Sequence, residues 1–564
     1  MARSYPLFSS QPEVTHMKTA ARPNPGILFK PGMPPAATGH PGVNRRSVTE
    51  NGMHIDYDVP VPMRDGVDIL IDVFRPATEQ PVPVIVAWSP YGKHAPFGYD
   101  MLEGSGVEPG TVSQYCALEA PDPGMFCPEG FAVVNVDPRG TWAVEGKHEM
   151  WSVSEGRDEY DLIEWLASQD WCTGKVGLGG VSYLAISQWF AAAQRPPHLA
   201  AINPWEGVSD VYREHAFHGG IPEEKFLALV QWFAGNSSTE VEDLATMRDD
   251  HPFDDEYWST HRAELSNIDV PAYVVAGWAD HGLHTRGSIE GYRNIASPHK
   301  YLEIHGRKKW AYYYLPESVA RQKAFFTRFL KDEPNEVDLW PAVRYELRES
   351  YYEGTELTAD AWPLPDTDYR TYHLDAALNA LTVDPAGSAT TEYDASTGST
   401  SFDLTFAERT AVVGHASLTL WLEARGSDDA DVFVGIEKLD TSGQQVDFPY
   451  FSTREDGPVA LGWLRASHRA VDEQRSTPEQ PRHRHISEDR LTAGEVVGLK
   501  IEIWPSGTAF EPGETLRLVI QGHDLRLYEH PAALHHTATR NTGTHVVHSG
   551  AEHDSALLLP IVQA

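Results

Sequence analysis

The stretch KVGLGGVSYLAISQWFAAA, residues 175–193, joins a run of small and apolar residues to a segment with a helix-like pattern. Its serine, Ser182, stands in a Gly-x-Ser step after Gly180. Nucleophilic serines on sharp strand-to-helix turns usually read Gly-x-Ser-x-Gly. Here Leu184 occupies the second glycine position, and the next small residue is Ala185. Two interpretations of Ser182 follow: a nucleophile in a tight turn, or an ordinary N-cap, for which serine is favoured.

Strand-like and helix-like segments alternate on both sides of this stretch. GVDILIDVFRP, VPVIVAWSPYG and FAVVNVDPRG are strand-like, and EGRDEYDLIEWLASQDW is helix-like with acidic residues at its start. The strand pattern returns in VPAYVVAGWAD and KYLEIHG, and VARQKAFFTRFLKD is typical of a closing amphipathic helix. Such alternation indicates a parallel sheet with helices on both faces. We therefore predict an α/β-hydrolase core over residues 50–205 and 268–338.

The remaining segments differ in texture from this core. Residues 206–267 are charged and aromatic, and EEKFLALVQWFAG (223–235) and EVEDLATMRDD (240–250) are helix-like, which predicts a helical lid inserted into the core. Residues 339–564 alternate apolar and polar side chains with turns between them, which predicts an all-β jelly roll. Residues 1–49 are rich in Pro and Gly in their later part and are expected to form an extended lead-in.

Composition limits the partners and the compartment. The formal net charge of −36 argues against nucleic acid, whose phosphates need a basic face, and against anionic membrane surfaces. The three cysteines imply no disulfide framework, and the first twenty residues have no apolar core of signal-peptide length. No apolar run is long enough to span a bilayer. We expect a cytoplasmic protein.

Chain order extends the prediction from one serine to a catalytic triad. Serine hydrolases of this fold place Ser, then Asp or Glu, then His in chain order, at strand ends. Asp280 ends the next strand after the predicted lid, and His305 ends the strand after that. In such a triad the acid orients the imidazole, and the imidazole takes the serine proton. Among the competing histidines His281, His284 and His299, none follows a new strand.

Several motifs together resemble one family of hydrolases. MRDGVDILIDVFRPA, SPYGK, VNVDPRGTWAVEG, GWADHGL, LRASHR and the serine block are similar to the cocaine-esterase/NonD-type hydrolases, relatives of X-prolyl dipeptidyl aminopeptidases and α-amino-acid ester hydrolases. The resemblance covers roughly residues 50–560, and this family tolerates alanine where Ala185 stands. It implies that Ser182 is the nucleophile and Asp280 the acid. It also implies that the Tyr91 hydroxyl and the backbone N–H of Tyr183 bind the oxyanion.

The histidine departs from the family pattern. Family members commonly read Gly-Pro-Trp-x-His after the last strand, whereas this chain reads HGRKKW and has Trp310 at that histidine position. Either His305 has taken over the role, or the triad is incomplete. We predict the first, because Ser182, Tyr91 and Asp280 all remain in pattern.

The predicted function is hydrolysis of a carboxylic ester through an acyl-enzyme on Ser182, with a small-molecule ester or amide as substrate. An amidase or X-prolyl-type peptidase and an acyltransferase are the alternatives on the same triad. A ligand-binding protein with a decayed triad is the alternative of another class. We expect aromatic residues such as Tyr91 and Trp278 to hold the substrate, together with the lid. The oligomeric state, including a homo-oligomer, is left open.

No cofactor and no metal are expected. The histidines of RHRHISED (482–489) and of the C-terminal tail form no compact ligand set with cysteines or carboxylates. We assign them to solvent-facing strands.

Overall fold

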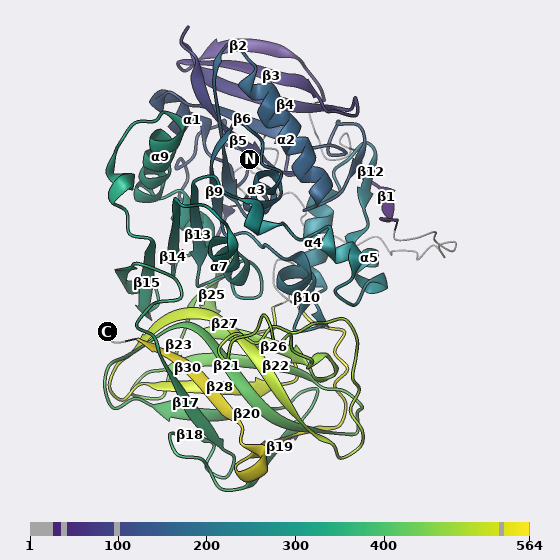
Figure 1. Ribbon diagram of the computed structural model, residues 1–564, viewed down its shortest axis with the longest axis vertical. Helices are drawn as coiled ribbons and strands as arrows, with labels where there is room; N and C mark the ends of the chain where they lie inside the picture. Colours follow the sequence, from purple (N-terminus) through teal and green to yellow (C-terminus); the bar gives the residue numbers. More distant parts are fainter. Residues whose placement is uncertain (1–25, 35–41, 95–101, 529–534, 563–564) are drawn as a thin grey trace, which may run out of the picture.

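The computed structural model describes residues 26–34, 42–94, 102–528 and 535–562. A mixed α/β part occupies the upper half of Figure 1 and a part made almost wholly of strands occupies the lower half. Of the predicted lead-in, residues 1–25 and 35–41 lie outside the described residues, as do 95–101, 529–534 and 563–564. Within the rest of the lead-in, β1 (Phe29–Pro31) pairs with a strand of the insertion and β2 (Arg46–Glu50) joins the main sheet.

The upper part is built on one long sheet. Its spatial order is β2, β3 (Met53–Pro62), β4 (Asp68–Pro76), β6 (Ala132–Asp137), β5 (Val82–Trp88), β8 (Cys172–Val181), β9 (Leu199–Trp205), β13 (Ala272–Gly277), β14 (Lys300–His305), β15 (Val343–Ser350) and β16 (Glu353–Ala359). Neighbouring strands are parallel from β6 through β15 and antiparallel at both edges. The predicted parallel α/β core is therefore present, and β9 lies directly between β8 and β13.

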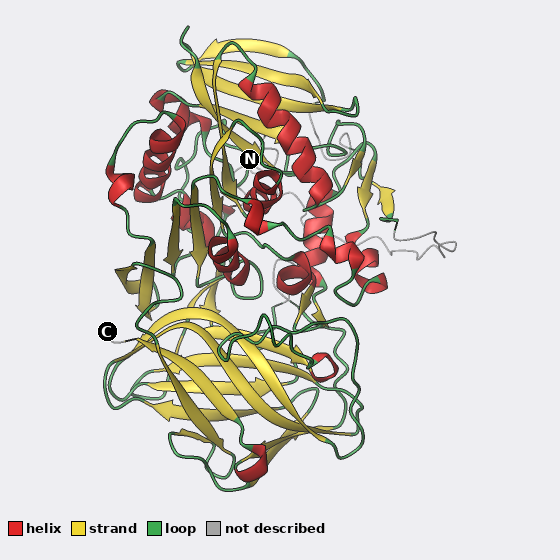
Figure 2. Cartoon of the chain, viewed as in Figure 1, coloured by secondary structure: helices red, strands yellow, loops and turns green. Residues whose placement is uncertain are grey.

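Helices cover both faces of this sheet (Figure 2). In the strand β5, Val84 and Val86 belong to the core that includes residues of α2 (Val153–Ala167) and α3 (Tyr183–Ala193). Ile85, between them, packs in the other core, with α9 (Pro316–Leu330). Because side chains alternate across a strand, a run that is apolar at every position must be buried on both sides. No helix in the described residues combines the length and apolar character needed to cross a bilayer.

The insertion at residues 206–267 contains helices and short strands. The helical segments are a π-helical turn (Tyr212–Ala216), α4 (Lys225–Ala234), α5 (Leu244–Asp250), α6 (Glu256–Ser259) and a 3-10 turn (Leu265–Asn267). Short strands accompany them: β10 (Phe217–His218), β11 (Ile221–Pro222) and β12 (Glu240–Glu242). The helix expected over 223–235 is present, whereas the segment 240–250 begins as a strand and becomes helical only at Leu244. In Figure 1, α4 and β10 lie between α2 and the C-terminal strands.

Beyond residue 339 the described chain contains strands and short 3-10 turns and no α-helix. The long strands are β17 (Asp368–Asp375), β20 (Ser399–Thr405), β21 (Thr410–Arg425), β22 (Asp431–Leu439), β27 (Val496–Phe510), β28 (Thr515–Gln521) and β30 (Ala556–Val562). They pair antiparallel around an apolar core of their own. The buried guanidinium of Arg348 on β15 donates to Val459 O at 3.0 Å and Ser506 Oγ at 2.7 Å, which ties the two parts together.

One expectation about histidines is wrong. Four of those assigned to solvent-facing strands are buried: His483, His485, His536 and His545. The ring of His536 is bonded to Asp524 and lies 2.8 Å from that of His218 in the insertion. Several therefore serve as buried polar contacts between chain segments. The three cysteines are unpaired.

Candidate active site

Ser182 occupies a strained turn between β8 and α3. Its φ of 58° and ψ of −115° lie in a region that non-glycine residues rarely adopt. The backbone N–H of Ser182 donates to Trp205 O at 2.9 Å and Glu206 O at 3.1 Å, so the end of β9 holds the turn. The hydroxyl makes no capping bond to α3. Ser182 is therefore not an ordinary N-cap, although it stands at the N-cap position.

Close packing around the turn explains the residue at position 185. A Cβ added to Gly207 would lie 2.8 Å from the Cβ of Ala185 and 3.0 Å from the backbone nitrogen of Ile186. Gly180 has φ +134°, and a Cβ there would lie 2.5 Å from the side chain of Leu184. The turn needs a small residue at 185 because Gly207 approaches it closely, and alanine satisfies that need.

Asp280 and His284 come from the single turn that follows β13. The backbone N–H of His284 donates to Asp280 O at 3.1 Å, which brings the two side chains to the same side of the turn. His284 Nδ1 is bonded to Asp280 Oδ2, and His284 Nε2 lies 3.3 Å from the Oγ of Ser182. All three residues are buried. Because the Asp280 carboxylate can only accept, the bond places the ring proton on Nδ1 and leaves Nε2 free to accept from Ser182.

The expectation that His305 lies between Ser182 and Asp280 is wrong. His305 does end β14, but its Nε2 lies 3.0 Å from Glu206 Oε1 and its ring stacks on Tyr312 at 4.0 Å. The strand-end rule failed because the turn after β13 supplies both the acid and the imidazole. The signal was present in the sequence as Asp-x-x-x-His, a spacing that aligns two side chains in a helical turn.

A buried lysine stands beside the acid and the imidazole. The Nζ of Lys309 lies 3.5 Å from both Asp280 Oδ2 and His284 Nδ1. Burial opposes ionisation of Asp280, but Lys309 and His284 outweigh it and hold the pKa of this carboxyl well below its usual range. Burial and Lys309 lower the pKa of His284 to about 4, against the opposing effect of Asp280. His284 is therefore neutral at neutral pH, so its Nε2 can accept a proton.

Tyr91 and the first amide of α3 meet at the serine. Burial raises the pKa of the Tyr91 hydroxyl, while hydrogen bonds with Ser182 and the backbone of Tyr183 lower it. The Tyr91 ring packs against those of Tyr183 at 5.9 Å and Phe233 of α4 at 5.6 Å. The first N–H groups of a helix have no partner within it, and that of Tyr183 points out of α3 to the Tyr91 hydroxyl. The structure thus brings Tyr91 and Tyr183 together beside Ser182.

A buried ion cluster anchors the loop that carries Tyr91. Two residues further on, the Lys93 ammonium is bonded to Asp58 and lies 3.2 Å from Asp72. The backbone N–H of Lys93 donates to Asp137 Oδ1 at 2.8 Å. These carboxylates belong to β3, β4 and β6, so the loop is fixed to three strands of the sheet.

Comparison with known proteins identifies the family. The X-Pro dipeptidyl-peptidase (S15 family) domain matches residues 65–243, and the X-Pro dipeptidyl-peptidase C-terminal non-catalytic domain matches residues 335–558. A CocE/NonD family hydrolase from Staphylococcus aureus has a solved structure that is 38% identical, with a TM-score of 0.89. The match covers 93% of this chain and 98% of that chain. The chain belongs to the CocE/NonD family of hydrolases.

One further relative and one more distant structure are also similar to the chain. The cocaine esterase of a Rhodococcus species is 26% identical over 616 residues, covering 92% of this chain and 100% of that protein. The structure of an α-amino acid ester hydrolase is 16% identical with a TM-score of 0.68, covering 98% of this chain and 99% of the other, and shares the fold.

The tryptophan at the expected histidine position has a different task in this CocE/NonD hydrolase. The Nε1 of Trp310 donates to Glu119 Oε1 at 2.6 Å. Burial raises the pKa of Glu119 to about 7 against the opposing effects of Lys309 and this bond. The chain thus has no histidine at position 310, and the imidazole of His284 reaches Ser182 from the turn after β13 instead. Ser182, His284 and Asp280 together form a complete cluster.

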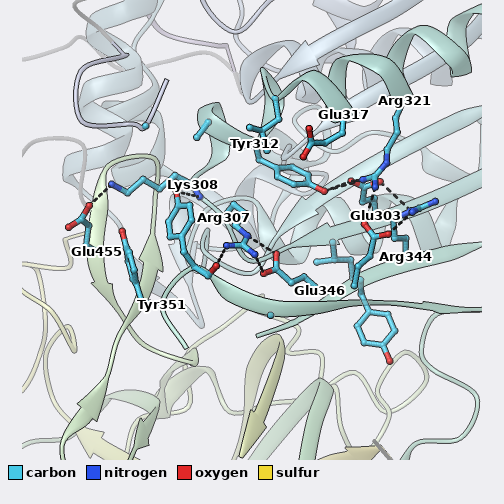
Figure 3. A pocket seen from close by; sticks show the side chains of 18 residues that line it. Glu303, Arg307, Lys308, Tyr312, Glu317, Arg321, Arg344, Glu346, Tyr351 and Glu455 are labelled. Carbon is cyan, nitrogen blue, oxygen red and sulfur yellow. Dashed lines mark hydrogen bonds and ion pairs between the residues drawn. The ribbon is translucent and has the colours of Figure 1, made fainter. Parts of the chain in front are cut away.

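A cavity of about 680 Å³ opens on the outer side of this region, next to α8 (Lys309–Tyr313) (Figure 3). Two of its charged pairs are Lys308 with Glu455 at 2.8 Å and Arg307 with Glu346 at 2.7 Å. Tyr312, which stacks on His305, lines the cavity, whereas Ser182 does not.

Proposed function

We propose that this protein hydrolyses carboxylic esters through an acyl-enzyme on Ser182, with His284 as the general base and Asp280 as the acid that orients it. The observation that carries the proposal is the imidazole of His284, which lies between Ser182 Oγ and Asp280 Oδ2. The proteins similar to this chain include one named cocaine esterase and one named α-amino acid ester hydrolase.

The reaction proceeds in two steps. Ser182 Oγ attacks the ester carbonyl while its proton passes to His284 Nε2, and the imidazolium then gives that proton to the departing alkoxide. Water attacks the acyl-enzyme in the second step, with His284 taking one water proton and returning it to Ser182 Oγ as the acid leaves. The negative charge on the carbonyl oxygen is stabilised in both steps by the Tyr91 hydroxyl and the Tyr183 N–H.

Ester cleavage is preferred over the alternatives for a chemical reason. An alkoxide leaves the tetrahedral intermediate more readily than an amine, which leaves only after it has been protonated. Amide or X-prolyl peptide cleavage remains the second candidate, favoured by the match to the S15 peptidase family. Acyl transfer would use the same acyl-enzyme. The contact between Ser182 and His284 counts against a decayed binding protein.

The insertion at residues 206–267 is proposed to be a lid that supplies aromatic surface for the substrate. Phe233 packs on Tyr91, and Phe226 lies against His215 at 5.2 Å and Phe451 at 6.5 Å. Trp278, by contrast, is fully buried against Trp362 and donates to Glu346 O at 2.7 Å. Its predicted part in substrate binding is withdrawn, because its ring and its N–H are both occupied.

Two polar groups near the site lack partners among the described residues. Both ring nitrogens of His215 and the Nε1 of Trp151 are buried without a hydrogen bond. The two rings lie 4.8 Å apart, and Trp151 lies 5.3 Å from Tyr183. Buried polar groups normally find a partner. An aromatic ester with an oxygen substituent would provide one, so we propose such esters as the substrate class.

Two further proposals concern the C-terminal part of the chain and the location of the protein. The C-terminal part is proposed to be a jelly roll that closes one side of the substrate site through residues such as Phe451. A cytoplasmic location is proposed from the three cysteines, which form no disulfide.

Labelling with a serine-directed fluorophosphonate tests the proposed function. We expect one adduct, mapped to Ser182, that is abolished by Ser182→Ala. Ser187→Ala is the matched control, because Ser187 is a buried serine of α3 whose hydroxyl donates to Leu184 O at 3.2 Å. An unlabelled wild-type protein that also fails to hydrolyse aryl esters would contradict the proposal.

A further inference from the structure

The carboxyl group of Glu206 reaches the acid of the proposed triad from the neighbouring strand. Glu206 follows β9, which lies between the strands that carry Ser182 and Asp280. Its carbonyl accepts from the Ser182 N–H, and its own N–H donates to Val275 O at 2.8 Å. The side chain is fully buried and its Oε2 lies against Gly277, where a Cβ would be only 2.7 Å away. Glu206 is thus held at the backbone and at the side chain.

The two carboxyl groups share one hydrogen bond. Asp280 Oδ2 faces His284 and Lys309, whereas its Oδ1 is buried and meets no N–H or hydroxyl group of the described residues. The side chains of Glu206 and Asp280 are hydrogen-bonded to each other. Two ionised carboxylates cannot form such a bond, because both only accept. One of the two therefore carries a proton.

Neighbouring groups decide which carboxyl carries it. Asp280 has the His284 N–H and the Lys309 ammonium on one oxygen, and both favour its ionised form. Glu206 feels the Lys309 charge without an ion pair in the described residues, and its hydrogen-bond donor is the neutral imidazole of His305, whose Nδ1 accepts from Arg307 N–H at 3.2 Å. That bond places the His305 proton on Nε2, which donates to Glu206 Oε1 at 3.0 Å. Burial, together with the negative charge of Asp280, raises the pKa of Glu206 well above its usual value.

We infer that Glu206 is a protonated positioning residue whose Oε2–H donates to Asp280 Oδ1, extending the cluster to a one-directional chain of hydrogen bonds from His305 to Glu206 to Asp280. His284 donates to the other oxygen of Asp280 and accepts from Ser182. The chain gives every oxygen of both carboxyl groups a hydrogen-bond partner: Glu206 Oε2 donates, and the other three oxygens accept. It keeps the Asp280 charge available to the His284 imidazolium and fixes the rotation of the Asp280 side chain. This inference rests on the proposed roles of Ser182, His284 and Asp280.

Substitution at Glu206 separates a protonated acid from an ionised one. Glu206→Gln keeps an acceptor for His305 and an N–H donor for Asp280, so we expect kcat/KM on an aryl ester within about threefold of wild type. Glu206→Leu removes both bonds and leaves Asp280 Oδ1 without a donor, and we expect a loss of at least about 30-fold, equivalent to about 2 kcal/mol. Thermal unfolding of each variant reports whether it folds.

Infrared difference spectroscopy of wild type against Glu206→Gln provides a second readout. It reports the protonation state of Glu206, which a purely structural role would not require. We expect the difference spectrum at neutral pH to contain the carbonyl stretch of one protonated carboxylic acid, which the wild type has and Glu206→Gln lacks. A Gln variant as inactive as the Leu variant, or a carboxylate band in place of the acid band, would overturn the inference. Fluorophosphonate labelling of wild-type Ser182 is independent of both results, so failure of the proposed function is recognised separately.

Discussion

Replacing Lys309 by methionine tests how the buried charge sets the basicity of His284. The Lys309 Nζ lies 3.5 Å from His284 Nδ1, so protonation of the imidazole creates a repulsion with the ammonium. Coulomb's law gives about 5 kcal/mol for this pair at an effective dielectric constant of about 20, and about 1 kcal/mol in water. One pH unit corresponds to about 1.4 kcal/mol. Removal of the charge should therefore raise the pKa of His284 by about one unit or more from its value of about 4.

The assay is the pH dependence of kcat/KM on an aryl ester. The reaction needs neutral His284, so activity is lost as pH falls through its pKa, and a higher pKa moves this acid limb to higher pH. Lys308→Met is the matched control, because its ammonium binds Gly104 O and Glu455 instead. Thermal unfolding accompanies the assay, since removing one partner of a buried ion pair typically costs about 3–5 kcal/mol. A folded Lys309→Met enzyme with an unmoved or lowered acid limb would refute the reasoning.

Three further outcomes are expected. Tyr91→Phe should lower kcat by about 10²–10³-fold with little change in stability, because it removes one oxyanion donor. Steady-state kinetics tests the loss of kcat, and thermal unfolding tests the unchanged stability. Gly207→Ala should destabilise the protein by about 1–3 kcal/mol by denaturant unfolding, because the new Cβ would meet Ala185 at 2.8 Å. Gly387→Ala is its control, with no atom within 4 Å of the added Cβ, and equal effects would count against the packing argument. An ester should have a higher kcat/KM than an amide with the same acyl group, and a preference for X-Pro amides would favour the peptidase alternative.

The architecture of the core was predictable because local patterns determine it. Strands buried on both faces are apolar on both sides, and β5 shows that pattern over its whole length, as does β6 over its first three residues. The insertion was harder, since β12 is held by pairing with β1 and β7 (Lys147–His148), segments distant in sequence. The local sequence of β12 does not indicate these pairing partners.

The residues of the candidate site likewise differ in how far the sequence predicts them. Ser182 and Asp280 stand at ends of recognisable strands, so their convergence follows from the order of a parallel sheet. The imidazole did not follow, because the choice between His284 and His305 depends on the path of the turn after β13. In the structure, Glu206 packs against Gly277, and the ring of His305 contacts the carboxyl of Glu206 instead of that of Asp280. Side-chain direction at a turn is a tertiary property.

The central claim is that His284, rather than His305, activates Ser182, and the rate of acylation in single-turnover experiments with an aryl ester tests it most directly. We expect His284→Ala to lose at least about 10³-fold in this rate, as members of a triad do. We expect His305→Gln to retain the rate within about tenfold, and the surface variant His299→Ala to match wild type. Rapid acylation in folded His284→Ala, together with its loss in His305→Gln, would contradict the claim.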